Sequence, residues 1–210
     1  MRNKSAFVAI ALASGAFILP SCGEKKPAET AEIKPATASE KPSYGGYESQ
    51  AKWGEHLITA GACADCHTPK KMTSQGPADD SSLWLSGHPA GLPIPPVDRK
   101  QLESKGIAAT QTMTAWIGPW GVSFAANITS DETGIGNWKE DQFIKCIRDG
   151  KYLGLDTERP LLPPMPWPSF RNFSDDELKA MFAYLKSTKP IKNLVPSYMP
   201  PALAQGAPKK

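Results

Sequence analysis

The sequence has little net charge and few cysteine residues. Its 24 Lys and Arg residues outnumber its 21 Asp and Glu residues by only three, whereas a protein that binds nucleic acid needs a stronger positive surface. Its four cysteines are too few for a small fold that disulfides hold together. Because the chain has only 210 residues, it fits one compact domain with appendages, and a large multidomain enzyme is excluded.

The sequence also lacks an apolar run long enough to remain in a membrane as a helix. Its longest run, residues 6–19, has fourteen residues, whereas a helix needs about 20 to cross the hydrocarbon core of a bilayer. The run follows Arg2 and Lys4, and this order is typical of an N-terminal export signal. We therefore expect an exported protein.

A cysteine follows this apolar run directly. The residues Leu19-Pro-Ser-Cys22 resemble the bacterial lipobox, and this resemblance implies cleavage before Cys22 and attachment of a lipid to its sulfur. Two other interpretations stay open. One is an ordinary signal peptide that is cut nearby, with Cys22 incidental, and the other is an uncleaved anchor. The lipobox interpretation places the mature protein on the periplasmic side, tethered to a membrane by lipidated Cys22.

The remaining chain divides by composition. Beyond Cys22, the sequence is dominated by Glu, Lys, Pro, Ala and Thr, which cannot bury enough apolar surface to offset the entropy lost on ordering. We predict a signal peptide at 1–21, a disordered tether at 22–47, one domain at 48–190 and a C-terminal tail at 191–210.

The strongest motif of the domain is Cys63-Ala-Asp-Cys66-His67. This C-x-x-C-H spacing is the attachment pattern of c-type haem. Two thiols on one helical turn can both reach the vinyl groups of one porphyrin edge, and the adjacent His67 imidazole then supplies a nitrogen to the iron. A thioredoxin-like redox pair would not need the histidine, and a structural zinc site would need a second Cys/His cluster, which the sequence lacks. We predict one haem c.

The sixth iron ligand is less directly specified. Met165 lies in residues 159–170, where five prolines stiffen the backbone, and a stiff loop reduces the entropy lost when a weak thioether binds iron. We therefore predict Met165. His88 is the main rival, although we interpret it as a loop histidine that faces solvent, and Met181 falls on an apolar helix face that indicates core. The further candidates are Met72, Met113, Met199 and His56.

Several segments together resemble a known family. In chain order they are Gly54-Glu-His-Leu57, the haem motif, Ala126-Asn-Ile-Thr-Ser-Asp131, Thr133-Gly-Ile-Gly-Asn-Trp138, Pro164-Met-Pro-Trp167 and Ser174-Asp-Asp-Glu177. They look like class I type cytochrome c domains, which occur as electron-accepting subunits of periplasmic membrane-bound dehydrogenases. The resemblance covers residues 51–189 and implies that His67 and Met165 are the axial ligands. Those subunits often carry three such domains, whereas this chain has one, and residues 68–125 form a long insertion.

Helical spacing predicts three helices in the domain that carries the Cys63–His67 motif. One covers residues 48–59 and leads into the haem motif. A second helix begins at a capping box that starts at Asn137, and this helix ends at Gly150. The last helix begins at the capping box Ser174–Glu177. Gly54 should allow the first and last helices to approach closely.

These helices predict a mainly α cytochrome c fold, with several helices around one covalently bound haem and long loops rich in Pro and Gly. No alternating strand pattern of useful length appears, and we interpret residues 121–128 as a loop that lines the haem. Arg148 and Lys151 are candidates to lie near the haem propionates, and Cys146 is interpreted as a small buried core residue.

These features predict an electron carrier, which is not itself an enzyme and passes single electrons between redox partners. The partners would be a dehydrogenase, an oxidase or other cytochromes, with no role for nucleic acid. A haem enzyme, or a protein that binds gas or peroxide, is the alternative and would need a labile sixth ligand, with only His88 available as a distal base. A haem sensor would need an output module that the sequence lacks.

Overall fold

The structure is a computed structural model and describes residues 43–202. The predicted signal peptide, Cys22 and most of the predicted tether lie outside the described residues, as do residues 203–210. Within 43–202, no helix is long and apolar enough to cross a membrane.

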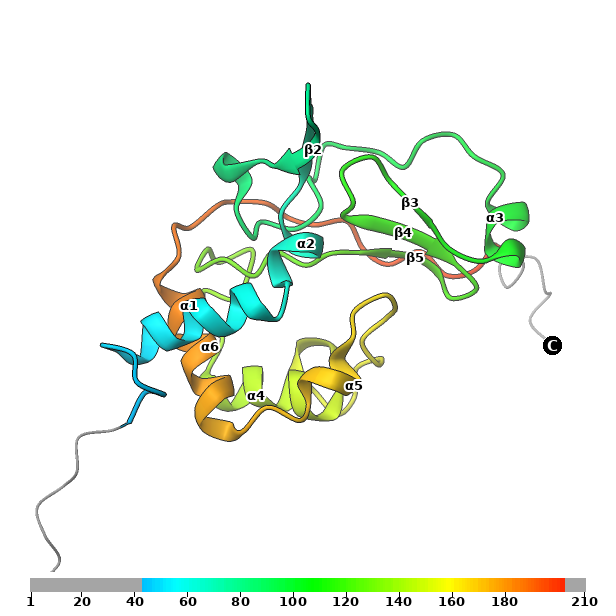
Figure 1. The fold of residues 1–210 in the computed structure, drawn as a ribbon. Coiled ribbons are helices and arrows are strands. Elements are labelled where there is room, and N and C mark those ends of the chain that lie inside the picture. The colour runs from blue at the N-terminus through cyan, green and yellow to red at the C-terminus, as the bar shows by residue number, and fades with distance from the viewer. Residues whose placement is uncertain (1–42, 203–210) are drawn as a thin grey trace, which may run out of the picture. The chain divides into compact units, whose positions relative to one another are not determined.

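The described residues form six α-helices, two short 3₁₀ helices and five strands (Figure 1). The first half contains α1 (Gln50–Ala60), α2 (Cys63–His67), β1 (Lys70–Thr73), β2 (Gly76–Asp79), η1 (Ser81–Leu83) and α3 (Arg99–Lys105). The second half contains β3 (Ala108–Ala109), β4 (Ala115–Gly118), β5 (Gly121–Phe124), α4 (Glu140–Asp149), η2 (Tyr152–Gly154), α5 (Trp167–Phe170) and α6 (Asp175–Ser187).

The fold mixes helices with two antiparallel sheets, so the expectation of a mainly α fold is too narrow. Strands β1 and β2 form one sheet, and β3, β4 and β5 form the other in that order. Residues 121–124, which we expected in a loop, are strand β5 and pair with β4 across a turn at Pro119 and Trp120. The strand pattern was invisible because β4 and most of β5 are buried residue after residue, so polar and apolar positions do not alternate.

Helices α1 and α6 cross closely at Gly54, as predicted. A Cβ atom added to Gly54 would lie 1.8 Å from the carbonyl oxygen of Ala180 and 2.9 Å from Cβ of Tyr184. Only glycine leaves room for this backbone approach. The contact joins the helix before the haem motif to the last helix and thereby sets the position of α2.

The helix ends confirm two of the three predicted signals. Ser174 caps α6 in a complete capping box, in which its side chain accepts from the Glu177 amide and the Glu177 carboxylate accepts from the Ser174 amide. Gly150 ends α4 in the left-handed region, with φ +62°. The capping box expected at Asn137 is wrong, because α4 begins after Lys139 without a side-chain cap.

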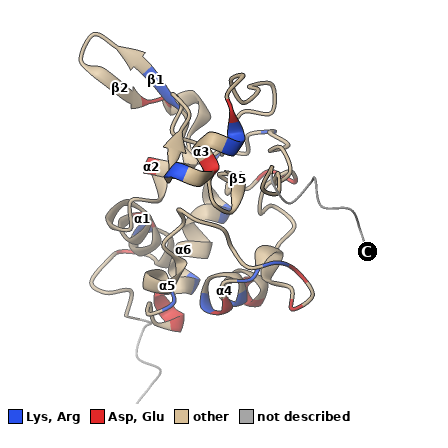
Figure 2. Cartoon of the chain, turned by 90° about the vertical axis from the view of Figure 1, so that its right-hand side faces the viewer, with Lys and Arg blue, Asp and Glu red and all other residues tan. Residues whose placement is uncertain are grey.

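The core of the domain lies where α1, α4 and α6 pack together. Its most buried side chains include Ile58, Leu85, Leu178 and Leu185, and Met181 belongs to it as predicted. Cys146 is also buried. The helices at its edge carry both signs of charge, as Figure 2 shows for α4.

Residues 191–202, which we assigned to a tail, make specific contacts with the domain. The Asn193 amide donates to the carbonyl oxygens of Ser86 and His88, and Met199 exchanges two main-chain hydrogen bonds with Val122 in β5. The contacts of the domain therefore continue beyond residue 190, to Ala202.

Candidate functional site

The functional candidates gather around a cavity of about 500 Å³. This volume falls within the range of roughly 300–1,000 Å³ that is usual for sites of cofactors and similar ligands. In both views α2 lies above the level of α4 and α5 (Figures 1 and 2), and all three elements contribute lining residues. Most lining side chains are apolar, among them Ile58, Trp138, Phe143, Ile147, Leu162 and Phe170.

His67 lines the cavity in a defined tautomer. Its Nδ1 lies 2.7 Å from the carbonyl oxygen of Ala126, and because a carbonyl can only accept, Nδ1 carries the proton and Nε2 keeps its lone pair. Burial lowers the pKa of His67, which favours the neutral imidazole. A neutral imidazole with its second nitrogen held by a backbone carbonyl is the usual state of a metal-ligating histidine.

The loop that holds His67 is itself fixed by Asn127. The Asn127 side-chain oxygen accepts from the amide and the hydroxyl of Thr129, and its side-chain nitrogen donates to the carbonyl oxygen of Ile191. Asn127 therefore acts as a turn residue, because its side chain bonds to the backbone two positions further along the chain. Residues 125–128 line the cavity, so the expectation of a lining loop holds for this part of 121–128.

Cys63 and Cys66 lie one helical turn apart on α2, and both line the same cavity as His67. Burial raises the pKa of Cys63 to about 12 and also raises the pKa of Cys66. A reactive redox pair depends on a thiol with a lowered pKa. These two cysteines therefore fit a covalent attachment point better than a thioredoxin-like redox pair.

Met165 lines the cavity from the proline-rich segment before α5. It is partly buried and packs against the core. Its loop is anchored from the sheet, because the Ser123 hydroxyl donates to the carbonyl oxygen of Pro163 at 2.6 Å. The fold thus brings Met165 to the same cavity as the Cys63–His67 motif across about a hundred residues of sequence, and its role as a ligand stays a prediction.

His88 does not face solvent, so that interpretation is wrong. Its side chain is 0 % exposed, and Nε2 donates to the carbonyl oxygen of Leu92 at 2.9 Å while Nδ1 accepts from the Thr114 hydroxyl at 2.9 Å. Both ring nitrogens are thus used within the protein, and His88 is not among the residues that line the cavity. The sequence hid this because Thr114 is distant along the chain.

The remaining candidate ligands fall into two groups. Met181 contacts the cavity from the core side. The others do not line it: Met72, Met113 and Met199 are exposed, and His56 stacks on Tyr47 with ring centroids 5.2 Å apart.

A cationic residue that the sequence analysis missed contributes to the cavity wall. The Arg159 guanidinium lies 4.0 Å from the ring centroid of Tyr152 and 5.4 Å from that of Tyr198, and all three residues line the cavity. Arg148, one of the two candidates from the sequence, instead bonds to the carbonyl oxygens of Arg171 and Phe173 and to the carboxylate of Asp175. Lys151 does not line the cavity either.

Comparison with known proteins finds relatives that are named as subunits of dehydrogenases. No family model matches the chain. The chain is 31 % identical over 169 residues to a subunit of nicotinate dehydrogenase from Pseudomonas putida, and the match covers 80 % of this chain and 11 % of that protein. It is 33 % identical over 138 residues to the "Gluconate 2-dehydrogenase cytochrome c subunit" of Pantoea cypripedii, covering 65 % of this chain and 23 % of the relative.

A third relative matches a shorter stretch. The "Alcohol dehydrogenase (quinone), cytochrome c subunit" of Gluconobacter oxydans is 39 % identical over 75 residues, which is 35 % of this chain and 15 % of the relative. The chain therefore spans less than a quarter of the length of these three proteins.

Proposed function

Because this chain is a relative of cytochrome c subunits of dehydrogenases, we propose that it is a c-type cytochrome that carries single electrons through one haem c. One observation carries the proposal: Cys63, Cys66 and the free Nε2 of His67 meet on the wall of one apolar cavity. This donor set fits haem c, since two thiols can form thioethers to the porphyrin and a neutral imidazole can bind its iron.

Each part of the cavity has a role in this proposal. Cys63 and Cys66 would hold the group covalently, and His67 and Met165 would bind its iron. The haem supplies an iron that alternates between the ferrous and ferric states. The apolar lining would exclude water, while Arg159 at the cavity wall would provide a cation for a haem propionate.

Electron transfer is favoured over the catalytic alternative by the position of His88. A haem enzyme or a protein that binds peroxide would use a distal histidine beside the iron. His88 was the only candidate in the sequence, and both of its ring nitrogens are bonded to Thr114 and Leu92. Met165 instead lines the cavity, where it would keep the sixth position filled, as a carrier requires.

The partner and the location follow from the relatives and from the sequence. We propose a dehydrogenase as the electron donor, because the relatives are named as dehydrogenase subunits. We also propose that the protein acts on the periplasmic side of a membrane and is tethered there by a lipid on Cys22. This part is supported by residues 1–22 of the sequence alone.

The ligand assignment is tested by optical spectra of the purified protein in both oxidation states. The oxidised wild type should show the weak sulfur-to-iron charge-transfer band of a low-spin His/Met haem, and mass spectrometry should find one haem per chain. Met165→Ala should remove the band and yield iron that binds added ligands. Met72→Ala, at a methionine that is 58 % exposed, is the matched control and should leave the band intact.

Three results would contradict the proposal. Survival of the band in Met165→Ala would exclude Met165 as the ligand, and two haems per chain would exclude a single site. Pigment that stays bound through denaturing electrophoresis after both Cys63→Ser and Cys66→Ser would exclude thioether attachment.

A further inference from the structure

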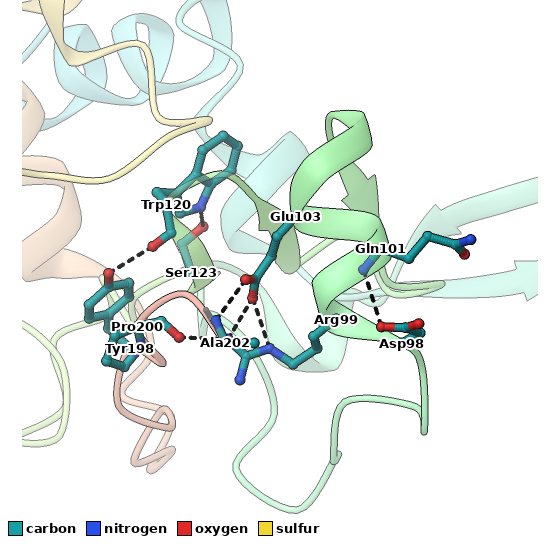
Figure 3. A network of polar contacts seen from close by, with 9 residues as sticks. All are labelled: Asp98, Arg99, Gln101, Glu103, Trp120, Ser123, Tyr198, Pro200 and Ala202. Carbon is teal, nitrogen blue, oxygen red and sulfur yellow. Dashed lines mark hydrogen bonds and ion pairs between the residues drawn. The ribbon is translucent and has the colours of Figure 1, made fainter. Parts of the chain in front are cut away.

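A buried ion pair on the 68–125 insertion contacts the C-terminal segment, residues 194–202. Glu103 on α3 has a side chain only 5 % exposed, and its carboxylate accepts from Nε and Nη2 of Arg99 at 3.0 and 2.6 Å. The second carboxylate oxygen accepts from the amide of Ala202 at 2.7 Å, and Arg99 also donates to the carbonyl oxygen of Pro200 at 2.6 Å. Figure 3 shows both side chains meeting this segment.

This arrangement is specific because both charges are largely removed from water. A buried charge is costly unless its partner and its hydrogen bonds are in place. Here the bonds left over from the ion pair end on the backbone of Pro200 and Ala202. The ion pair therefore selects the one position of the C-terminal segment that satisfies it.

The same segment is joined to the sheet immediately before it reaches the ion pair. Met199 exchanges main-chain hydrogen bonds with Val122 of β5, and the Tyr198 hydroxyl donates to the carbonyl oxygen of Trp120 at 2.7 Å. Gly121 permits this approach, because a Cβ atom there would lie 2.2 Å from the carbonyl oxygen of Met199. The segment thus extends the sheet beyond β5.

The held segment forms one wall of the cavity. Residues 194–198 all line it, and Tyr198 lies under the guanidinium of Arg159. A second set of hydrogen bonds reaches the proline-rich loop that carries Met165. Trp120 Nε1 donates to the Ser123 hydroxyl at 3.1 Å, and that hydroxyl donates to the carbonyl oxygen of Pro163. Pro163 precedes Met165 by two residues.

We propose that Glu103 and Arg99 are positioning residues of the haem cavity, which hold residues 194–202 in place as its wall and so keep water from the haem. This inference rests on the proposed function. Water that enters beside a haem favours the more highly charged ferric state. Loosening the ion pair should therefore lower the reduction potential, although neither Glu103 nor Arg99 lines the cavity.

The test compares Glu103→Gln with Glu55→Gln in the full-length protein with its haem. Both variants replace a helical glutamate that pairs with a basic residue, but the Glu55 pair with Lys52 is exposed and lies on α1. In Glu103→Gln, hydrogen exchange at the amides of Val122 and Ala202 should become at least tenfold faster. At a fixed applied potential the ratio of reduced to oxidised protein should fall at least threefold. Glu55→Gln should change neither quantity.

Two further variants cover the case in which Glu103→Gln does not fold. Arg99→Lys keeps the charge but cannot make the paired contacts of the guanidinium, and it should shift the ratio in the same direction by a smaller factor. Tyr198→Phe leaves the ion pair intact and removes the hydrogen bond to Trp120. It should therefore lower the ratio of reduced to oxidised protein, with little change in hydrogen exchange at the Ala202 amide.

The possible failures are distinguishable. Faster exchange in Glu103→Gln with an unchanged ratio would show a purely structural ion pair and overturn the inference, as would unchanged exchange. A wild-type protein without covalently bound haem would overturn the proposed function instead, and this is read from the pigment before any variant is compared.

Discussion

His88 and Lys70 show how single polar side chains are satisfied inside this domain. His88 is fully buried between Thr114 and Leu92, with the ring of Phe124 5.1 Å away between centroids. The Lys70 ammonium, on a side chain only 11 % exposed, donates to the carbonyl oxygens of Ala64 and Thr68 and pairs with Asp79 at 2.5 Å. Ala64 lies in α2 and Asp79 in β2, so Lys70 ties the haem-motif helix to the hairpin that follows it.

Lys70→Met should lower the free energy of unfolding by about 1–3 kcal/mol, because it leaves polar groups around the side chain without their partner. Lys71→Met is the matched control, since its side chain is exposed and its nitrogen lies 3.9 Å from Asp80. We expect this control to cost no more than about 0.5 kcal/mol. Chemical denaturation measures both, and equal losses would show that the Lys70 contacts contribute nothing specific.

The buried position of His88 predicts that stability falls in mild acid. Burial lowers the pKa of His88 below 6.5, so the unfolded chain binds a proton more readily than the folded one. The contribution is complete above about pH 6.5 and is lost as the pH falls toward the lowered pKa. Urea denaturation should therefore show lower stability at pH 5.5 than at pH 7.5, and His88→Gln should reduce this difference. An unchanged difference in the variant would assign the effect to other groups.

The crossing of α1 and α6 is the contact between elements on which the site most depends. It places α1 directly ahead of α2, and therefore controls where Cys63, Cys66 and His67 enter the cavity. Because the crossing is a backbone contact at Gly54, no rotamer change can relieve an added side chain.

Gly54→Ala should push the two helices apart and cost at least about 3 kcal/mol, the upper end of the usual cost of overpacking. Gly91→Ala is the matched control, because an added Cβ there meets nothing within 4 Å and should leave stability nearly unchanged. Thermal denaturation compares the two variants with the wild type. A Gly54→Ala protein as stable as Gly91→Ala would mean that the helices do not cross this closely.

At the scale of the whole protein, the proposed lipid on Cys22 would determine where the domain lies relative to the membrane. A tether of roughly 25 residues has a random-coil reach of about 25–30 Å, so the domain would stay close to the membrane while remaining free to turn. This geometry suits a carrier that meets both a donor and an acceptor. It depends on Cys22, which lies outside the described residues.

Cys22→Ala should release the protein from the membrane fraction and abolish incorporation of labelled fatty acid, while the optical spectrum of the haem domain stays the same. Cell fractionation and metabolic labelling measure these outcomes. A variant that still sediments with membranes and still carries label would favour an uncleaved anchor instead. A changed spectrum would show that Cys22 contacts the domain.

The features that the sequence determined by itself are local ones. They are the C-x-x-C-H motif at Cys63–His67, the capping box at Ser174 and the end of α4 at Gly150, and each lies in a short stretch of chain. Spacing along a helix and capping chemistry involve neighbours within a few residues, so the sequence alone expresses them. The proline-rich loop around Met165 was identifiable for the same reason.

The tertiary structure alone decided the contacts between distant segments. Strand β5 forms because it pairs with β4, whose residues Ala115–Gly118 are all buried. His88 is held in the interior by a hydrogen bond with Thr114. Arg159, and not Arg148, lines the cavity. The clearest case is Glu103, whose partners include the backbone of Ala202. Such contacts join residues up to about a hundred positions apart, and no local pattern records which distant group will fill a given hydrogen bond or cavity wall.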